Sequence, residues 1–253
     1  MNKRLLAGSL VLLISLAVPP PSGATTWAPK EVVCPNCKTT NTFQAIMSYG
    51  SYIYSWPSKF QYIFWPLIDS PVLYCCKKCR LTAFMWDFEQ LPKDKFPAIQ
   101  KQLNTAKLDG SFDVYTKIPM SARLLIAEKV YSELSKDDDF WCRFYRVLGY
   151  HLETEKKEAE AAEARKKALR LAEKMAGLQE NAGSLKELLL ISGAMRHFLN
   201  DDAGALRDFK QAQGLKFQDP SDAKRSENVD AYLAQLLAEY IQTIQTTQKT
   251  KTL

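Results

Sequence analysis

The sequence predicts an α+β protein that is mainly α, in which a small cysteine-containing module precedes an antiparallel array of helices. Two Cys-x-x-Cys motifs, at residues 34–37 and 76–79, lie in a segment rich in aromatic residues, β-branched residues and turn formers. From residue 121 the composition changes to Ala, Leu, Glu and Lys, with apolar residues at helical spacing. Hydrophobic residues make up 46% of the chain, so a sizeable core is possible.

The first 24 residues predict a signal peptide. Lys3 and Arg4 form a basic start, residues 5–18 are apolar, and residues 22–24 are small enough for cleavage. The apolar run is shorter than the roughly 20 residues that a spanning helix needs, so we expect no stable membrane span after cleavage. We therefore expect an exported protein with a periplasmic or extracellular location.

The two Cys-x-x-Cys motifs predict a metal site within residues 25–96. Each motif can place two thiolates around one ion, and four thiolates form the closed tetrahedral set of a structural zinc site. We expect Cys34, Cys37, Cys76 and Cys79 to bind one structural Zn²⁺ ion. Cys76, rather than its neighbour Cys75, has the two-residue spacing to Cys79. Short strands at residues 31–33 and 72–74 should lead into the motifs, which is typical of a zinc ribbon.

Both motifs depart from the usual turn sequence, in which a glycine follows the second cysteine and adopts a left-handed backbone conformation. Lys38 and Arg80 occupy these positions, and Lys77 replaces the proline that Pro35 provides in the first motif. The departures predict a less regular turn. Together with Lys78, however, the basic residues would partly neutralise a negatively charged zinc tetrathiolate.

Two other uses of the cysteines stay open in an exported protein. Each motif could close on itself as a disulfide, with Cys75 and Cys142 as a third pair, although such short loops make poor crosslinks. Alternatively, Cys34, Pro35, Asn36 and Cys37 could form the site of a thiol-disulfide oxidoreductase. That alternative lacks a surrounding βαβ pattern and leaves the second motif unexplained.

Between the motifs, residues 49–65 carry many Tyr, Trp and Phe side chains. They could form the core of a small insertion, or a surface that binds glycans or the membrane interface. Trp56 and Trp65 each precede a proline, which argues against one continuous helix. Residues 97–120 then predict a connector with short helical pieces.

The remaining chain predicts a helical module over residues 121–245 and a flexible tail over 246–253. Ser121 is the expected N-cap of the first helix, and the acidic residues 137–139 mark the start of the second. The expected helices cover residues 121–134, 138–153, 156–175, 184–200, 202–215 and 228–243.

A weak internal repeat relates two of the helix pairs. Aligning Gly149 with Gly193 matches small residues that let paired helices pack closely, as in a tetratricopeptide repeat. Phe209 occupies the position where that repeat favours an aromatic ring, and Arg165 is its counterpart in the first pair. The matched alanines are Ala161 with Ala205 and Ala168 with Ala212.

The chain resembles an uncharacterised bacterial family that joins a paired Cys-x-x-Cys, zinc-ribbon-like module to tetratricopeptide-like helices. The resemblance rests on residues 33–37, 70–79 and 84–88 and on the downstream helices. It implies metal binding and an interaction with a protein or peptide, without an established activity.

Other features point away from catalysis and nucleic acid. No phosphate-binding glycine loop, nucleophile elbow or His-Glu-x-x-His motif is present, so an enzyme is the less favoured interpretation. His151 and His197 are expected on helix surfaces. The net charge of +6 is mild and dispersed, which argues against nucleic acid as a partner.

Overall fold

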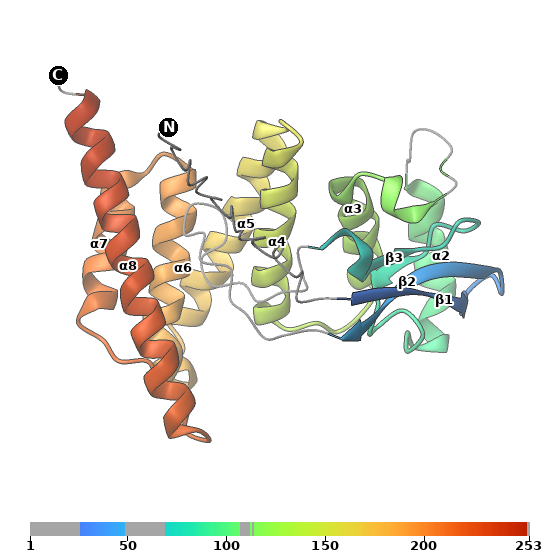
Figure 1. Ribbon diagram of the computed structural model, residues 1–253, viewed down its shortest axis with the longest axis horizontal. Coiled ribbons are helices and arrows are strands. Elements are labelled where there is room, and N and C mark those ends of the chain that lie inside the picture. The colour runs from blue at the N-terminus through green and yellow to red at the C-terminus, as the bar shows by residue number, and fades with distance from the viewer. Residues whose placement is uncertain (1–25, 49–68, 107–111, 113, 252–253) are drawn as a thin grey trace, which may run out of the picture.

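The computed structural model describes residues 26–48, 69–106, 112 and 114–251. The predicted class is confirmed: the described chain is mainly helical and carries two small antiparallel sheets (Figure 1). The expected signal peptide (residues 1–24) and the aromatic stretch at 49–65 lie outside the described residues. Within the described ranges, no helix is both long and apolar enough to cross a membrane.

Each Cys-x-x-Cys motif is the turn of a β-hairpin. β1 (Thr26–Val33) pairs with β2 (Thr40–Ser48), and β3 (Leu73–Cys75) pairs with β4 (Thr82–Phe84). A strand therefore leads into each motif, as predicted. β3, the strand expected at residues 72–74, begins one residue later, because Val72 ends the 3₁₀ turn η1 (Ser70–Val72) that contains Pro71.

Aromatic rings join the two hairpins. Phe43 of β2 stacks on Tyr74 of β3, with ring centroids 4.1 Å apart and planes 14° apart. Phe88 and Tyr115 place their ring edges against Phe43 at 5.2 Å and 4.9 Å. β3 and β4 have only three residues each, so these large rings add apolar contact between the two hairpins.

The 3₁₀ turn η2 (Lys93–Lys95) precedes the predicted connector of residues 97–120. The connector contains nearly all of α2 (Phe96–Thr105) together with η3 (Tyr115–Lys117), and it leads into α3 (Met120–Tyr131). α3 packs against α2 and both strands of the second hairpin. Ser121 is not the N-cap of α3, as the sequence predicted, because the helix begins one residue earlier and Pro119 takes the cap position. The Ser121 hydroxyl instead donates to Glu155 at 2.5 Å.

The next helices follow the predicted order. They are α4 (Asp138–Thr154), α5 (Glu158–Ala176), η4 (Gln179–Ser184), α6 (Leu185–Phe198) and α7 (Asp202–Gln213). Asp137 caps α4 by accepting a hydrogen bond from Phe140 N at 2.8 Å, so the acidic cluster does mark a helix start. α8 (Ala223–Lys251) is longer than predicted, and the tail expected to be flexible from residue 246 continues this helix as far as Lys251.

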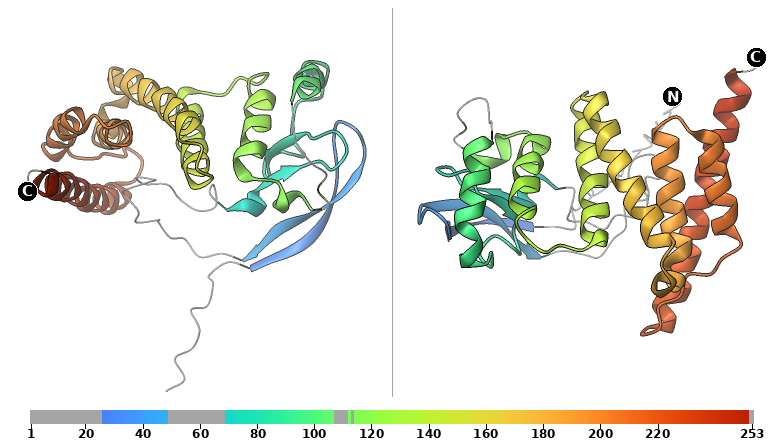
Figure 2. Two further views of the ribbon diagram at one scale, coloured as in Figure 1. Left: turned by 90° about the horizontal axis from the view of Figure 1, so that it is seen from above. Right: turned by 180° about the vertical axis from the view of Figure 1, so that it is seen from behind.

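Figure 2 shows the two hairpins with α2 and α3 at one end of an elongated molecule, and α6, α7 and α8 at the other. Hydrophobic packing does not follow the change in composition. One buried cluster extends from the hairpins through α3 into α4 and the start of α5, and a second joins the rest of α5 to α6, α7 and α8. α4 and α5 therefore connect the two ends of the protein.

The aligned glycines occupy equivalent places. Gly193 lies against the ring of Phe209, and a Cβ at Gly193 would overlap that ring. At Gly149, a Cβ would lie 3.1 Å from Cγ of Arg165, the counterpart of Phe209. The methylenes of Arg165 therefore cover a glycine as the aromatic ring does in the second pair. Four matched alanines are fully buried, namely Ala161, Ala168, Ala205 and Ala212.

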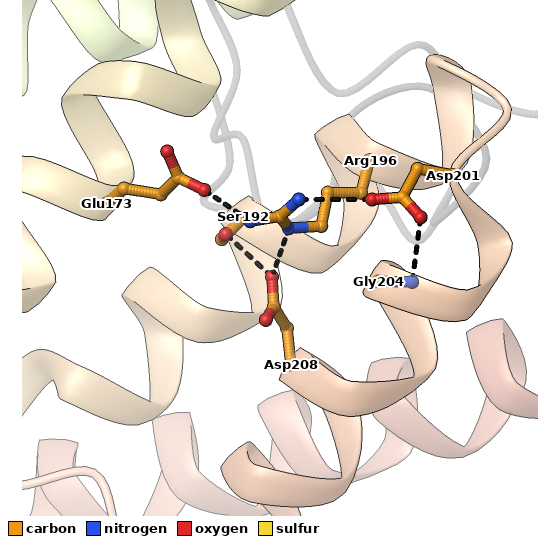
Figure 3. A network of polar contacts seen from close by, with 6 residues as sticks. All are labelled: Glu173, Ser192, Arg196, Asp201, Gly204 and Asp208. Atoms are coloured by element: carbon orange, nitrogen blue, oxygen red, sulfur yellow. Dashed lines mark hydrogen bonds and ion pairs between the residues drawn. The ribbon is translucent and has the colours of Figure 1, made fainter.

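A polar network around Arg196 of α6 ties three helices together (Figure 3). Its Nε donates to Asp208 of α7 at 3.0 Å, and its Nη1 to Asp201 at 3.0 Å. Nη2 pairs with Glu173 of α5, and Ser192 donates to the same Asp208 oxygen at 2.7 Å. A guanidinium suits this position because its planar fork can serve several carboxylates at once.

Candidate metal centre

The structure brings the four predicted ligands together. Sγ atoms of Cys34, Cys37, Cys76 and Cys79 all lie within 4.8 Å of one another. Cys34 and Cys79 sulfurs are 3.6 Å apart, and Cys37 and Cys76 sulfurs are 3.5 Å apart. Residues more than thirty-five positions apart in sequence thus form one compact group that could hold a metal ion.

The two motifs have the same backbone geometry. The N–H of Lys38 donates to the Cys34 carbonyl, and the N–H of Arg80 donates to the Cys76 carbonyl, each at 3.0 Å. Both Lys38 and Arg80 have φ of 62°, the left-handed conformation that glycine usually provides. The expectation of a less regular turn is therefore wrong. For a residue other than glycine, this left-handed conformation costs roughly 1–2 kcal/mol at each of the two positions.

Burial differs between the first and second cysteine of each motif. Cys34 and Cys76 are fully buried, whereas Cys37 and Cys79 are half-buried. This follows from the hairpin turns, in which the first cysteine continues a strand that enters the core and the second lies at the tip. The sulfur cluster therefore has one edge in the core and one close to solvent.

The four thiols ionise unequally because they lie so close together. Hydrogen bonding to Cys76 raises the pKa of Cys34 well above its ordinary value, and the same bond lowers the pKa of Cys76. The hydrogen bond with Cys34 lowers the pKa of Cys79. The hydrogen bond with Cys76 and burial have the larger combined effect and raise the pKa of Cys79 to about 12. For Cys37, burial acts against ionisation, yet hydrogen bonding with Thr39 lowers its pKa overall. A metal ion held by all four thiolates must therefore displace protons.

Arg123 of α3, a residue that no sequence motif singles out, fixes the second hairpin in place. The Arg123 side chain is fully buried and donates to the carbonyls of Ser70 and Leu73, both at 2.7 Å, and of Ile118 at 3.1 Å. Burial lowers the pKa of Arg123 to about 10. Its contacts hold the strand that ends at Cys75, directly before the second pair of predicted ligands.

Two hydrogen-bonding residues next to the sulfurs were also missed. Thr39 is joined to Cys37 Sγ at 3.3 Å, and the amide of Asn41 donates to Cys76 Sγ at 3.7 Å. The signal was present in the alternation of β2, where Asn41 shares the inward face with Phe43. A polar residue at an inward strand position predicts a specific buried partner.

The remaining cysteines and histidines do not join the cluster. All six cysteines are free thiols, and Cys75 and Cys142 are buried in different hydrophobic clusters, so they do not form the third disulfide pair. His151 and His197 lie on α4 and α6, and Nδ1 of His197 contacts Asp202 at 2.6 Å. Both histidines are half-buried rather than fully exposed.

Comparison of the chain with protein-family models, with curated proteins and with solved structures gave no match.

Proposed function

We propose that the protein binds one structural zinc ion through Cys34, Cys37, Cys76 and Cys79, and that its helical array binds a protein or peptide. The observation that carries the proposal is the convergence of four sulfurs within 4.8 Å from two turns of identical geometry. On this interpretation the protein is exported and has no catalytic activity.

The donor set and its spacing fit zinc. Sulfurs of a tetrahedral site with metal–sulfur bonds of about 2.3 Å lie about 3.8 Å apart, and the two closest pairs here are 3.5 Å and 3.6 Å apart. Thiolates are soft ligands that suit zinc or iron rather than magnesium or calcium. Zinc is preferred for an exported protein because it has no redox chemistry of its own.

A structural role fits better than a catalytic one. Four protein ligands fill a tetrahedral coordination sphere and leave no position for water or substrate. The ion would join the β1–β2 hairpin to the β3–β4 hairpin at their turns, as in a zinc ribbon. It would therefore complement the aromatic contacts between Phe43 and Tyr74, which join the same hairpins at their inner faces.

The oxidoreductase alternative has less support. An attacking thiol must be reached by its substrate and is activated at a helix N-terminus or beside a cation. Cys34, the expected attacking residue, is 0% exposed and lies in a β-hairpin turn.

The proposed interaction role rests on the helical array. α4–α5 and α6–α7 pack as two similar pairs with matched glycines and buried alanines, which supports a tetratricopeptide-like scaffold. A cavity of about 330 Å³ lies where this array meets the β4 hairpin, and its walls include Phe84, Trp86 and Arg143. Trp86 is 43% exposed, and exposed Trp and Arg side chains are typical of protein-binding surfaces.

Elemental mass spectrometry, with a free-thiol count, tests the metal assignment on chain purified without added metal. We expect about one zinc per chain, with four thiols that react only after chelation. Cys37→Ser should lose the metal, and Cys142→Ser is the matched control because Cys142 lies in the other buried cluster. Absence of zinc from the unmodified chain, with thiols that cycle under mild reductant, would instead support the oxidoreductase.

The export proposal has its own test. N-terminal sequencing of protein recovered from the periplasm or medium should begin near residue 25. Recovery only from the cytoplasm with Met1 intact would contradict export.

A further inference from the structure

Asn41 of β2 connects the two Cys-x-x-Cys motifs through its side-chain amide. Nδ2 donates to the carbonyl of Thr39 at 2.9 Å, directly before the strand that leaves the first motif. The same nitrogen donates to Cys76 Sγ at 3.7 Å, in the second motif. Oδ1 accepts the backbone N–H of Lys77 at 2.9 Å. One residue thus contacts both motifs, with each end of its amide engaged.

The amide can take only this orientation. Rotating it by half a turn would place Oδ1 against the Thr39 carbonyl and against a sulfur that must become a thiolate, and all three are acceptors. Asn41 is only 3% exposed, so water cannot replace the lost partners. A buried amide destabilises the fold unless its hydrogen bonds form. The hydrogen bonds of Asn41 form together only when the two motifs adopt the observed relative position.

We propose that Asn41 is a positioning residue of the metal centre, which sets the second motif against the first and donates a neutral hydrogen bond to the Cys76 thiolate. This inference rests on the proposed metal-binding function. Hydrogen bonds from outside the ligand set orient metal ligands, and their loss typically lowers metal affinity 10- to 100-fold. Asparagine suits the role because it adds a donor without adding charge.

The test uses the full chain and three variants. Asn41→Ala removes all three contacts, whereas Asn41→Asp keeps an acceptor for Lys77 N but replaces both donations with a negative charge. Asn36→Ala is the matched control, because Asn36 lies in the first motif but its amide donates to Gln100 at 2.8 Å rather than to sulfur. Zinc affinity is measured by competition with a chromogenic chelator. The sulfur-to-metal charge-transfer band is recorded after loading with Co²⁺.

We expect Asn41→Ala and Asn41→Asp to bind zinc about 10- to 100-fold more weakly than the unmodified chain, and both to shift the Co²⁺ band. Asn36→Ala should change neither quantity by more than a few-fold. If the unmodified chain binds zinc and both Asn41 variants match it in affinity and band position, the positioning role is wrong. If the unmodified chain itself takes up no metal, the proposed zinc function fails, and this inference fails with it.

Loss of thermal stability in the Asn41 variants without a change in affinity or in the Co²⁺ band would also overturn the inference, because it would assign Asn41 to the fold alone.

Discussion

Different kinds of contact stabilise the hairpin end and the helical end of the molecule. The hairpin module brings its strands together through four sulfurs, a few stacked rings and the buried guanidinium of Arg123. The distal helices pack through a continuous apolar cluster, with close contacts at Gly193 and the polar network of Arg196 around it. The hairpins bury their apolar side chains against α3 and α4 and have the sulfur cluster at their turns, whereas the paired helices bury theirs against each neighbour in turn.

Metal removal should show the largest difference between the two ends. Chelation or Cys37→Ser should unfold the hairpin module, because structural zinc contributes about 10–16 kcal/mol of apparent binding free energy. The helical array should keep most of its helical circular dichroism signal at 222 nm. Cooperative loss of both ends on chelation would show instead that α4 and α5 transmit unfolding through the shared cluster.

Arg123→Met should be the most damaging single substitution away from the sulfurs. It leaves the carbonyls of Ser70, Leu73 and Ile118 without their buried donor, at a cost of about 3 kcal/mol or more. Urea unfolding of the metal-loaded chain measures this cost. Arg143→Met is the control, because that side chain is 49% exposed. Equal stability of the two variants would contradict the role assigned to Arg123.

Acid should weaken the helical end through Asp230 of α8. The carboxylate pairs with Lys186 of α6 at 2.6 Å and accepts Phe217 N at 2.8 Å. Burial opposes its ionisation, but these bonds prevail and lower its pKa to about 2. Because the folded-state pKa lies below the ordinary 3.8, the stabilisation of about 2 kcal/mol is present above pH 4 and is lost as the pH falls toward 2.

Asp230→Asn tests this pH dependence directly. The difference in unfolding free energy between the unmodified chain and the variant should be constant near neutrality and shrink below pH 4. Comparing the chain with its variant cancels the separate effect of acid on the proposed metal site, because both carry the same four cysteines. A difference that stays unchanged down to pH 2 would rule out the ionised pair.

The smallest expected effect is a difference in stability between alanine substitutions at the matched glycines of the two helix pairs. Gly193→Ala forces a methyl group into the Phe209 ring, and overpacking of this kind costs roughly 1–3 kcal/mol. Gly149→Ala meets only the flexible methylenes of Arg165 at 3.1 Å, so the gain in helix propensity should offset most of its cost. Thermal unfolding should rank Gly193→Ala as the less stable variant, and the reverse ranking would contradict the packing difference.

The grouping of Cys34, Cys37, Cys76 and Cys79 and the positions of the helices could be predicted because their signals are local. Two-residue spacing identified Cys76 over Cys75 as the partner of Cys79, and helical periodicity located α4 to within one residue. The return strands β2 and β4 were missed, since β4 has only three residues and β2 begins in a polar run. Ser121 was misassigned because a serine before an apolar run resembles a cap, whereas its actual partner, Glu155, lies on a distant loop.

The sequence by itself determined which residues can form Cys-x-x-Cys turns, helices and closely packed helix pairs, because spacing along the chain controls those properties. Only the tertiary structure decided that Lys38 and Arg80 adopt a glycine-like conformation, that Arg165 covers Gly149 as a ring covers Gly193, and that Asn41 joins the two motifs. Each of these three features depends on contacts with residues that only folding brings close. The spacing of residues along the chain does not reveal which distant residues will come into contact.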